Sequence, residues 1–166
     1  FPVTGVRLWL RKLKQPVTNV EGSVGVRLER TRLGAGVEDH HTSSGAALPA
    51  QFLVDQAHRL PKGHALDVAA GRGRNALYLA AQGWTVEAID CDEEALASIA
   101  RTAKERHLSN LTVRCADLEA DPVLPASRYD VIMVFFYLQR NLFPAMLKAL
   151  RPGGVLVYET FLIDNP

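Results

Sequence analysis

A glycine-containing loop between two predicted strands constrains the fold of this chain more than any other feature. Residues 65–69 are mostly apolar and predict a strand, Gly71 and Gly73 follow in a short loop, and a helix is expected to begin near residue 74. A second apolar stretch ends in Asp90. Glycine accepts positive φ angles and lets the backbone approach a ligand closely. Strand, glycine turn, helix, strand and acid in this order are typical of a βαβ unit that holds a nucleoside-containing cofactor.

Charge near the loop distinguishes two candidate cofactors. The spacing Gly71-x-Gly73-x-x-Ala76 fits a dinucleotide fingerprint, and in either case Asp90 could accept hydrogen bonds from ribose hydroxyls. Asp67, however, lies inside the first strand, where its carboxylate would repel a pyrophosphate. The same carboxylate would attract the positive sulfonium and ammonium groups of S-adenosylmethionine. The sequence therefore favours S-adenosylmethionine over NAD(P).

Strands and helices are expected to alternate along the rest of the chain. A helix is expected to start at Pro49, before the first strand. The predicted elements are then strand 65–69, helix 74–82, strand 85–89, helix 93–106, strand 111–115, strand 129–135, helix 141–150 and strand 154–160. This alternation predicts an α/β fold with a doubly wound, mostly parallel, Rossmann-like sheet. Ligands bind at the carboxyl ends of such strands, where Asp90, Asp117 and Phe135 fall.

Four motifs in this order resemble those of the class I S-adenosylmethionine-dependent methyltransferases. They are Asp67-x-Ala-x-Gly71-x-Gly73, Ile89-Asp90-Cys91-Asp92, Ala116-Asp117-Leu118 and Leu150-Arg-Pro-Gly-Gly154. The stretch from Gly71 to Leu79 is similar to the tellurite-resistance-type subgroup. The resemblance covers roughly residues 48–166, so we expect a methyltransferase domain there and a basic, poorly defined segment over residues 1–47.

The resemblance implies S-adenosylmethionine as cofactor and methyl transfer to a small-molecule acceptor. It implies a cofactor site made of Asp67, Ala69, Gly71, Gly73, Arg74, Asn75, Asp90, Cys91, Asp117, Leu118 and Phe135. It assigns no catalytic base. A complete domain of this family has two further strands after the fifth, so the sheet is expected to be truncated there, with an exposed edge at residues 158–160.

Several of these residues also have plain structural interpretations. Asp67 could cap backbone amides of the glycine loop, Asn75 could be a helix N-cap, and Phe135 could belong to the core. Two other functions also stay open on the sequence. One is a nicotinamide-dependent oxidoreductase, and the other is a cofactor-binding module without catalysis.

Composition narrows the range of partners. The net charge is +1, which gives no general case for nucleic-acid binding, although residues 1–34 hold seven Lys or Arg and only two acids. No apolar run reaches the ~18 residues that a membrane-spanning helix needs. The two cysteines, Cys91 and Cys115, are expected to be reduced and partly buried, as in a cytoplasmic protein. No His/Cys/Asp spacing predicts a metal site.

Overall fold

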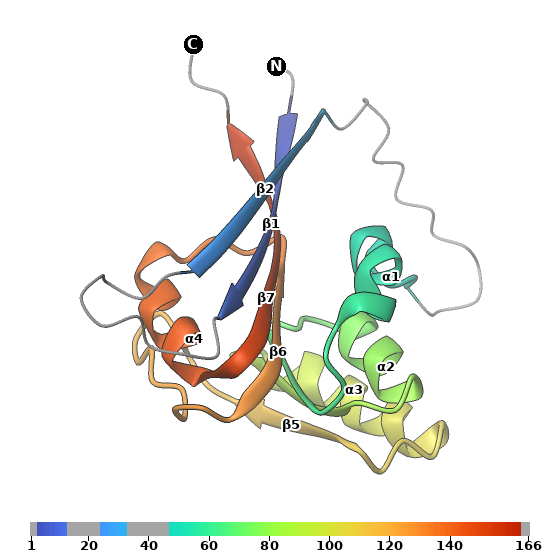
Figure 1. Ribbon diagram of the computed structural model, residues 1–166. Helices are drawn as coiled ribbons and strands as arrows, with labels where there is room; N and C mark the ends of the chain where they lie inside the picture. Colours follow the sequence, from blue (N-terminus) through green and yellow to red (C-terminus); the bar gives the residue numbers. More distant parts are fainter. Residues whose placement is uncertain (1–2, 13–23, 33–46, 164–166) are drawn as a thin grey trace.

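One mixed sheet organises the chain in a computed structural model that describes residues 3–12, 24–32 and 47–163 (Figure 1). Its strand order is β2-β1-β7-β6-β3-β4-β5. The strands are β1 (Val3–Lys12), β2 (Val24–Arg32), β3 (His64–Val68), β4 (Thr85–Asp90), β5 (Leu111–Cys115), β6 (Tyr129–Phe135) and β7 (Leu150–Ile163). The helices are α1 (Gln51–Gln56), α2 (Arg74–Ala81), α3 (Glu93–Glu105) and α4 (Phe143–Ala149), with 3-10 turns at Ala57–Arg59 and Arg140–Leu142.

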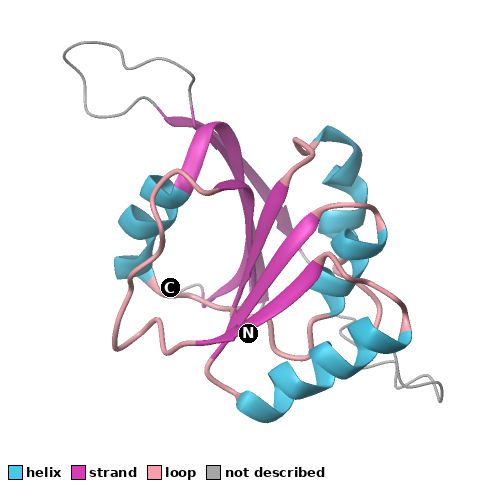
Figure 2. Ribbon diagram, turned by 90° about the horizontal axis from the view of Figure 1, so that it is seen from below, coloured by secondary structure: helices cyan, strands magenta, loops and turns pink. Residues whose placement is uncertain are grey.

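The part of the sheet from β5 to β7 is parallel throughout, and helices cover both of its faces. The pairs β4–β5, β3–β4, β3–β6 and β6–β7 all run parallel. Helices α1, α2 and α3 lie on one face and α4 lies on the other (Figures 1 and 2). The prediction of a doubly wound α/β fold is therefore confirmed.

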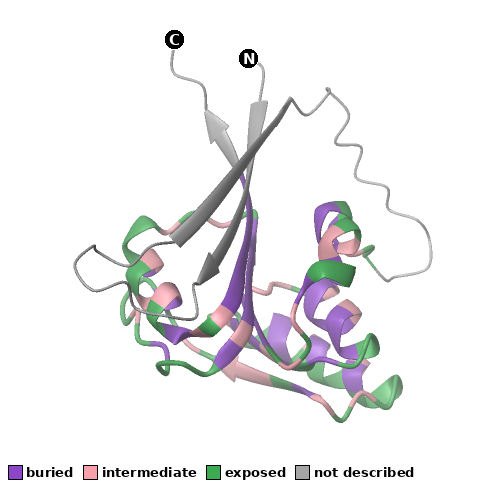
Figure 3. Ribbon diagram, viewed as in Figure 1, coloured by how far each residue is buried: buried purple, intermediate pink, exposed green. Residues whose placement is uncertain are grey.

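Two hydrophobic clusters, one on each face, hold these layers together. Ala65 of β3 packs with α2 and α3 in one cluster, whereas Leu66 and Val68 pack with α4 in the other. The central strands are buried on both faces, which explains why they are almost continuously apolar (Figure 3). The rigid sheet fixes the positions of the loops at its carboxyl edge. Among the described residues, no helix is long and apolar enough to cross a membrane.

The N-terminal strands alter one expectation about the sheet. β1 pairs antiparallel with β7, from Val3 opposite Ile163 to Arg11 opposite Val155, and β2 pairs antiparallel with β1. The edge expected to be exposed at residues 158–160 is thus covered, and that prediction is wrong. The pairing was missed because it joins segments about 150 residues apart, a separation that local patterns do not report. The division at residue 47 stays a prediction.

The observed helices and strands differ from the expected ones mainly in where they begin and end. Pro49 precedes α1 and does not lie in its first turn. A 3-10 turn takes up the start of the helix predicted at residue 141, and β7 begins at Leu150, ahead of the paired glycines. Gly83, with φ 92°, follows α2 as a left-handed cap, as glycine commonly does. The Asp92 side chain caps α3 by accepting hydrogen bonds from two backbone N–H groups.

Deleting residues 1–46 should destabilise the domain and make it associate. The deletion removes β1 and β2 and leaves the backbone N–H and C=O groups along the outer edge of β7 without partners. We expect a lower melting temperature and concentration-dependent oligomers by light scattering. A truncated protein that stays monomeric and melts at the temperature of the intact chain would contradict this role of β1.

Candidate cofactor site

The glycine loop between β3 and α2 turns through three left-handed residues. Ala69, Gly71 and Gly73 have φ angles of 53°, 52° and 72°. A Cβ atom at Gly73 would lie 2.5 Å from Cγ1 of Ile99, so this glycine allows the loop to pack against α3. A Cβ atom at Gly71 would meet nothing within 4 Å. The loop therefore packs tightly on one side and is open on the other, where a ligand can approach its backbone.

Asp67 lies beneath the loop and is only 2% exposed. Its Oδ2 accepts a hydrogen bond of 3.1 Å from the backbone N–H of Ala76, in the first turn of α2. Burial raises the pKa of Asp67 to about 7, and the nearby Asp90 carboxylate adds to the effect, while the Ala76 N–H and the Arg74 guanidinium oppose it. The carboxylate thus ties β3 to the start of α2, which is the structural role that the sequence left open.

Asp90 joins the glycine loop to the end of β4. Its Oδ2 accepts a 2.7 Å hydrogen bond from the N–H of Gly71, and its Oδ1 accepts a 3.0 Å bond from the N–H of Asp92. A carboxylate oxygen can accept two hydrogen bonds. Each oxygen of Asp90 therefore keeps acceptor capacity for a ligand hydroxyl while it holds the loop in place.

Asp117 occupies the equivalent position after β5. Its Oδ1 accepts hydrogen bonds from the backbone N–H groups of Glu119 and Ala120, at 2.9 and 3.1 Å, and fixes the turn that follows. The side chain of Leu118 in this turn is buried, whereas Asp117 is exposed. The turn therefore presents a carboxylate beside a buried apolar side chain.

A pocket of about 220 Å³ lies between these carboxylates. Its lining residues are Val68, Ala69, Ile89, Asp90, Cys91, Ala116, Asp117, Leu118, Glu119 and Tyr137. Five of them belong to the predicted site: Ala69, Asp90, Cys91, Asp117 and Leu118. The volume is below the ~300–1,000 Å³ typical of drug-sized ligands, and so it suits one part of a nucleoside cofactor.

The other predicted residues lie outside the lining of this pocket. Asp67, Gly71 and Gly73 form the loop and its support, as described above. Arg74 lies at the start of α2, where its Nη1 donates a 3.4 Å hydrogen bond to the Leu48 carbonyl. Asn75 is not the N-cap, a position that Gly73 occupies; it lies within α2 and its Oδ1 accepts a 2.8 Å bond from the N–H of Ala50.

Tyr137 lines the pocket where the sequence suggested Phe135. Phe135 is 7% exposed and packs in the core beneath α1 and α2. Tyr137 donates a hydrogen bond to Glu119 across the pocket, at 3.3 Å. Partial burial and the Glu119 carboxylate raise the pKa of Tyr137 to about 12, so its phenol stays protonated at neutral pH. Cys91 and Cys115 are free thiols, and both are exposed, contrary to the expected partial burial.

Comparison with known proteins identifies the family of the chain. The profile of a family described as "Methyltransferase domain" matches residues 65–154. A probable S-adenosyl-L-methionine-dependent methyltransferase TehB from Haemophilus influenzae is 31% identical over 102 residues, which cover 60% of this chain and 35% of that protein. Nocamycin O-methyltransferase from Saccharothrix syringae is 35% identical over 116 residues, covering 63% and 40%. This chain thus matches well under half the length of either relative.

Solved structures show the same fold. Coclaurine N-methyltransferase, bound to N-methylheliamine and SAH, matches with a TM-score of 0.58 and 22% identity, over 64% of this chain and 34% of that chain. The glycopeptide N-methyltransferase MtfA, complexed with S-adenosylmethionine, matches with a TM-score of 0.57 and 21% identity, over 68% and 50%. At these identities the likeness concerns the fold alone.

The chain belongs to the methyltransferase domain family, and its fold is that of the class I S-adenosylmethionine-dependent methyltransferases. The cofactor of this class is S-adenosylmethionine, and the residues present fit it. The loop is open at Gly71, and the Asp90 carboxylate lies within hydrogen-bond distance of that loop. The pocket between Asp90 and Asp117 has an apolar floor that suits a base.

Asp67 should make the stability of the domain depend on pH. Its pKa is about 7 in the folded protein, against 3.8 in the unfolded chain, so folding favours the protonated acid. This contribution is complete below about pH 4 and is lost as the pH rises towards about 7. Relative to an Asp67→Asn variant, the wild type should lose on the order of 2–3 kcal/mol of unfolding free energy between about pH 5 and 7. Urea denaturation at both pH values measures the difference, and parallel pH profiles of the two proteins would contradict it.

Ala69→Gly should stabilise the fold. Alanine pays a steric cost of roughly 1–2 kcal/mol in the left-handed conformation, and glycine avoids it at an entropic cost of roughly 0.5–1 kcal/mol. We expect a net gain of about 0.5–1 kcal/mol in the free energy of unfolding, measured by urea denaturation. Ala70→Gly, at a neighbouring position that does not have positive φ, is the matched control and should lower stability. A loss of stability in both variants would argue against strain at Ala69.

Proposed function

We propose that this chain binds S-adenosylmethionine at the carboxyl ends of β3, β4 and β5 and takes part in methyl transfer to a small-molecule acceptor. The observation that carries the proposal is the placement of Asp90 and Asp117 on either side of one apolar pocket, beside an open glycine loop. When bound, S-adenosylmethionine supplies an electrophilic methyl group on a sulfonium. The chain's own residues bind and orient it.

Each residue in the proposed site has a distinct role. Asp90 accepts hydrogen bonds from the ribose hydroxyls, using the acceptor capacity that Gly71 and Asp92 leave on its two oxygens. Asp117 and Leu118 hold the adenine, through a carboxylate and an apolar contact respectively.

The cofactor's charged end is proposed to lie over the glycine loop. Arg74, at the first position of α2, would bind the methionine carboxylate, because its planar guanidinium suits a carboxylate. Asp67 acts through the loop, since it is buried and bonded to Ala76. No general base is assigned, because a soft nucleophile such as a thiolate needs none.

The identity of the methyl acceptor and the cellular location are also proposals. Both named relatives are described as methyltransferases, and one is named for O-methylation of nocamycin, a small molecule. We propose a small-molecule acceptor and a cytoplasmic location, with no nucleic acid or membrane as partner. The net charge of +1 gives no general case for nucleic-acid binding. A nicotinamide-dependent oxidoreductase is the less favoured candidate, because Asp67 places a carboxyl group beneath the loop that would hold a pyrophosphate.

Asp90→Ala should weaken binding of S-adenosylhomocysteine, the demethylated product, by about 1.5–3 kcal/mol, because both ribose hydroxyls lose an ionised acceptor. Asp90→Asn should have an intermediate effect, since one acceptor oxygen remains. Isothermal titration calorimetry with S-adenosylhomocysteine measures both changes. In the wild type, NAD titrated in the same way should give no binding.

Asp92→Ala is the matched control for this experiment. Asp92 is a carboxylate in the same loop, but its side chain caps α3 and does not line the pocket. Its removal should cost about 1 kcal/mol of stability while leaving the dissociation constant within roughly a factor of two. Equal loss of affinity in the Asp90 and Asp92 variants, or tight NAD binding by the wild type, would refute the proposed site.

A further inference from the structure

Exposed apolar side chains lie beside the start of α2, directly after the glycine loop. Leu48 and Phe136 are 78% and 45% exposed, and Leu138, two residues after Phe136 in the chain, is 43% exposed. We refer to these three side chains as the acceptor surface. They are three of the four large apolar side chains that are exposed among the residues with described burial; the fourth is Val123. Such a concentration at one end of the sheet points to a ligand.

Arg74 joins the parts of this surface that lie far apart in the sequence. Its Nη1 donates a hydrogen bond to the Leu48 carbonyl, and its Cζ lies 5.3 Å from the centroid of the Phe136 ring. The segment before α1, the start of α2 and the end of β6 therefore meet at one place. That place directly follows Gly73, the last glycine of the loop.

The backbone of Phe136 is strained in a way that exposes the ring. Its φ angle is 60°, a left-handed conformation that is rare for a bulky aromatic residue. The N–H of Phe136 donates a 2.7 Å hydrogen bond to the carbonyl of Glu159 in the neighbouring strand β7, which holds the backbone there. Strain of this kind persists where the surrounding structure imposes it, and it is concentrated at functional sites.

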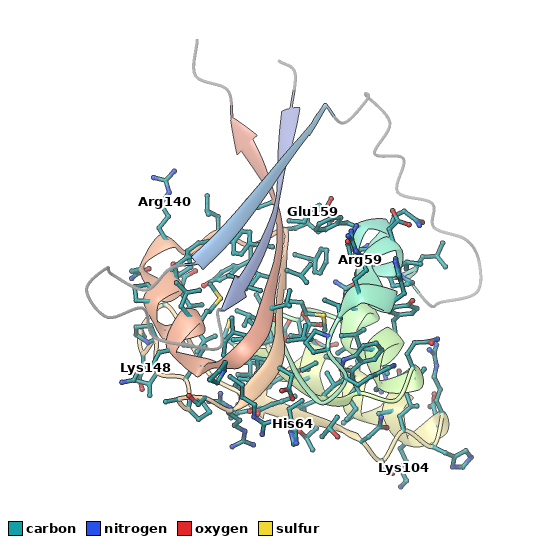
Figure 4. The ribbon with its side chains drawn as sticks, in the orientation of Figure 1. Arg59, His64, Lys104, Arg140, Lys148 and Glu159 are labelled. Carbon is teal, nitrogen blue, oxygen red and sulfur yellow. The ribbon has the colours of Figure 1, made fainter. Side chains whose placement is uncertain are left out.

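The next residue along the chain points into the cofactor pocket. Tyr137 lines that pocket and its backbone carbonyl accepts a hydrogen bond from the Tyr158 hydroxyl. The left-handed turn at Phe136 therefore places Tyr137 on the cofactor side and leaves Phe136 exposed next to Arg74. A molecule that rests on Phe136 lies beside the cofactor's charged end, as the proposed function arranges it. Figure 4 shows Glu159 at the same end of the sheet, on the side that carries α1.

We propose that the acceptor is a molecule with an apolar body, of about one aromatic ring, which packs on the acceptor surface and presents its nucleophilic atom to the cofactor. This inference rests on the proposed function. A strongly hydrated oxyanion such as tellurite would lose water on binding here. Leucine and phenylalanine side chains offer no hydrogen bonds to replace that water. An apolar body gains from the same contacts.

The test compares two thiols that differ mainly in their apolar body, phenylmethanethiol and 2-mercaptoethanol. Each is titrated calorimetrically into the full chain saturated with S-adenosylhomocysteine, and methyl transfer from S-adenosylmethionine is assayed with the same pair and with tellurite. We expect phenylmethanethiol to bind about tenfold or more tightly than 2-mercaptoethanol, and to be the better acceptor. Equal binding of the two thiols, binding of neither, or preference for tellurite would overturn the proposal.

Phe136→Gly tests the residue directly. Glycine removes the ring and relieves the left-handed strain, so the variant should melt within about 4 °C of the wild type or above it. It should bind S-adenosylhomocysteine as the wild type does and lose the preference for phenylmethanethiol. A large loss of stability together with loss of cofactor binding would show that the ring is a structural support and would overturn its role in the acceptor site.

Two control variants separate the possible causes. Val123→Gly removes the exposed apolar side chain that lies outside the acceptor surface, and His107→Gly relieves a left-handed residue, with φ 56°, at the end of α3. Neither should change the preference between the thiols, and a change in either would overturn the assignment. Absence of S-adenosylhomocysteine binding in the wild type would instead refute the proposed function on which this inference rests.

Discussion

The hydrogen bond from the Gly71 N–H to Asp90 is the contact on which the site depends. It spans 2.7 Å and joins the glycine loop after β3 to the end of β4. The parallel pairing of these strands brings the two segments together, and Ala70 strengthens the link by donating a 3.0 Å backbone bond to the Ile89 carbonyl. Oδ2 of Asp90 bonds the glycine loop at Gly71, and Oδ1 bonds the turn after β4 at Asp92. Each oxygen keeps further acceptor capacity, so the same carboxylate can order the loop and accept hydrogen bonds from a ligand that the loop holds.

Polar groups at the two ends of the sheet serve different purposes. At the amino ends, Asp130 accepts bonds of 2.8 Å from the His64 N–H and from the Arg151 guanidinium, which ties β3, β6 and β7 together. At the carboxyl ends, Asp90 and Asp117 accept their bonds from backbone N–H groups of the adjoining turns. A carboxylate paired with a cation is neutralised, whereas one that accepts only amide bonds keeps its charge available. The amino end of the sheet therefore supports stability and the carboxyl end supports binding.

Local patterns predicted the parallel part of the fold and much of the pocket. Glycine and proline mark the element boundaries. Because parallel strands have their carboxyl ends on the same side of the sheet, Asp90 and Asp117 could be placed near each other from the sequence alone. Two features could not be predicted. The pairing of β1 with β7 depends on a distant partner. Tyr137 replaces Phe135 in the pocket because the left-handed residue at Phe136 breaks the two-residue alternation of β6, and a sequence pattern does not reveal such a break.

Two neighbouring strands are each followed by a residue with strained backbone at the carboxyl end of the sheet. β3 is followed directly by Ala69 and β6 by Phe136, and both residues are left-handed although neither is glycine. Because β3 and β6 pair directly, the chain turns sharply away from the sheet at two adjacent points, and the loops diverge. Each left-handed residue costs roughly 1–2 kcal/mol, which the buried strands can offset because they pack on both faces. Ala69 lines the pocket between Asp90 and Asp117, and Phe136 lies beside Arg74. Under the proposed function, the strained backbone therefore lies between the cofactor and the acceptor.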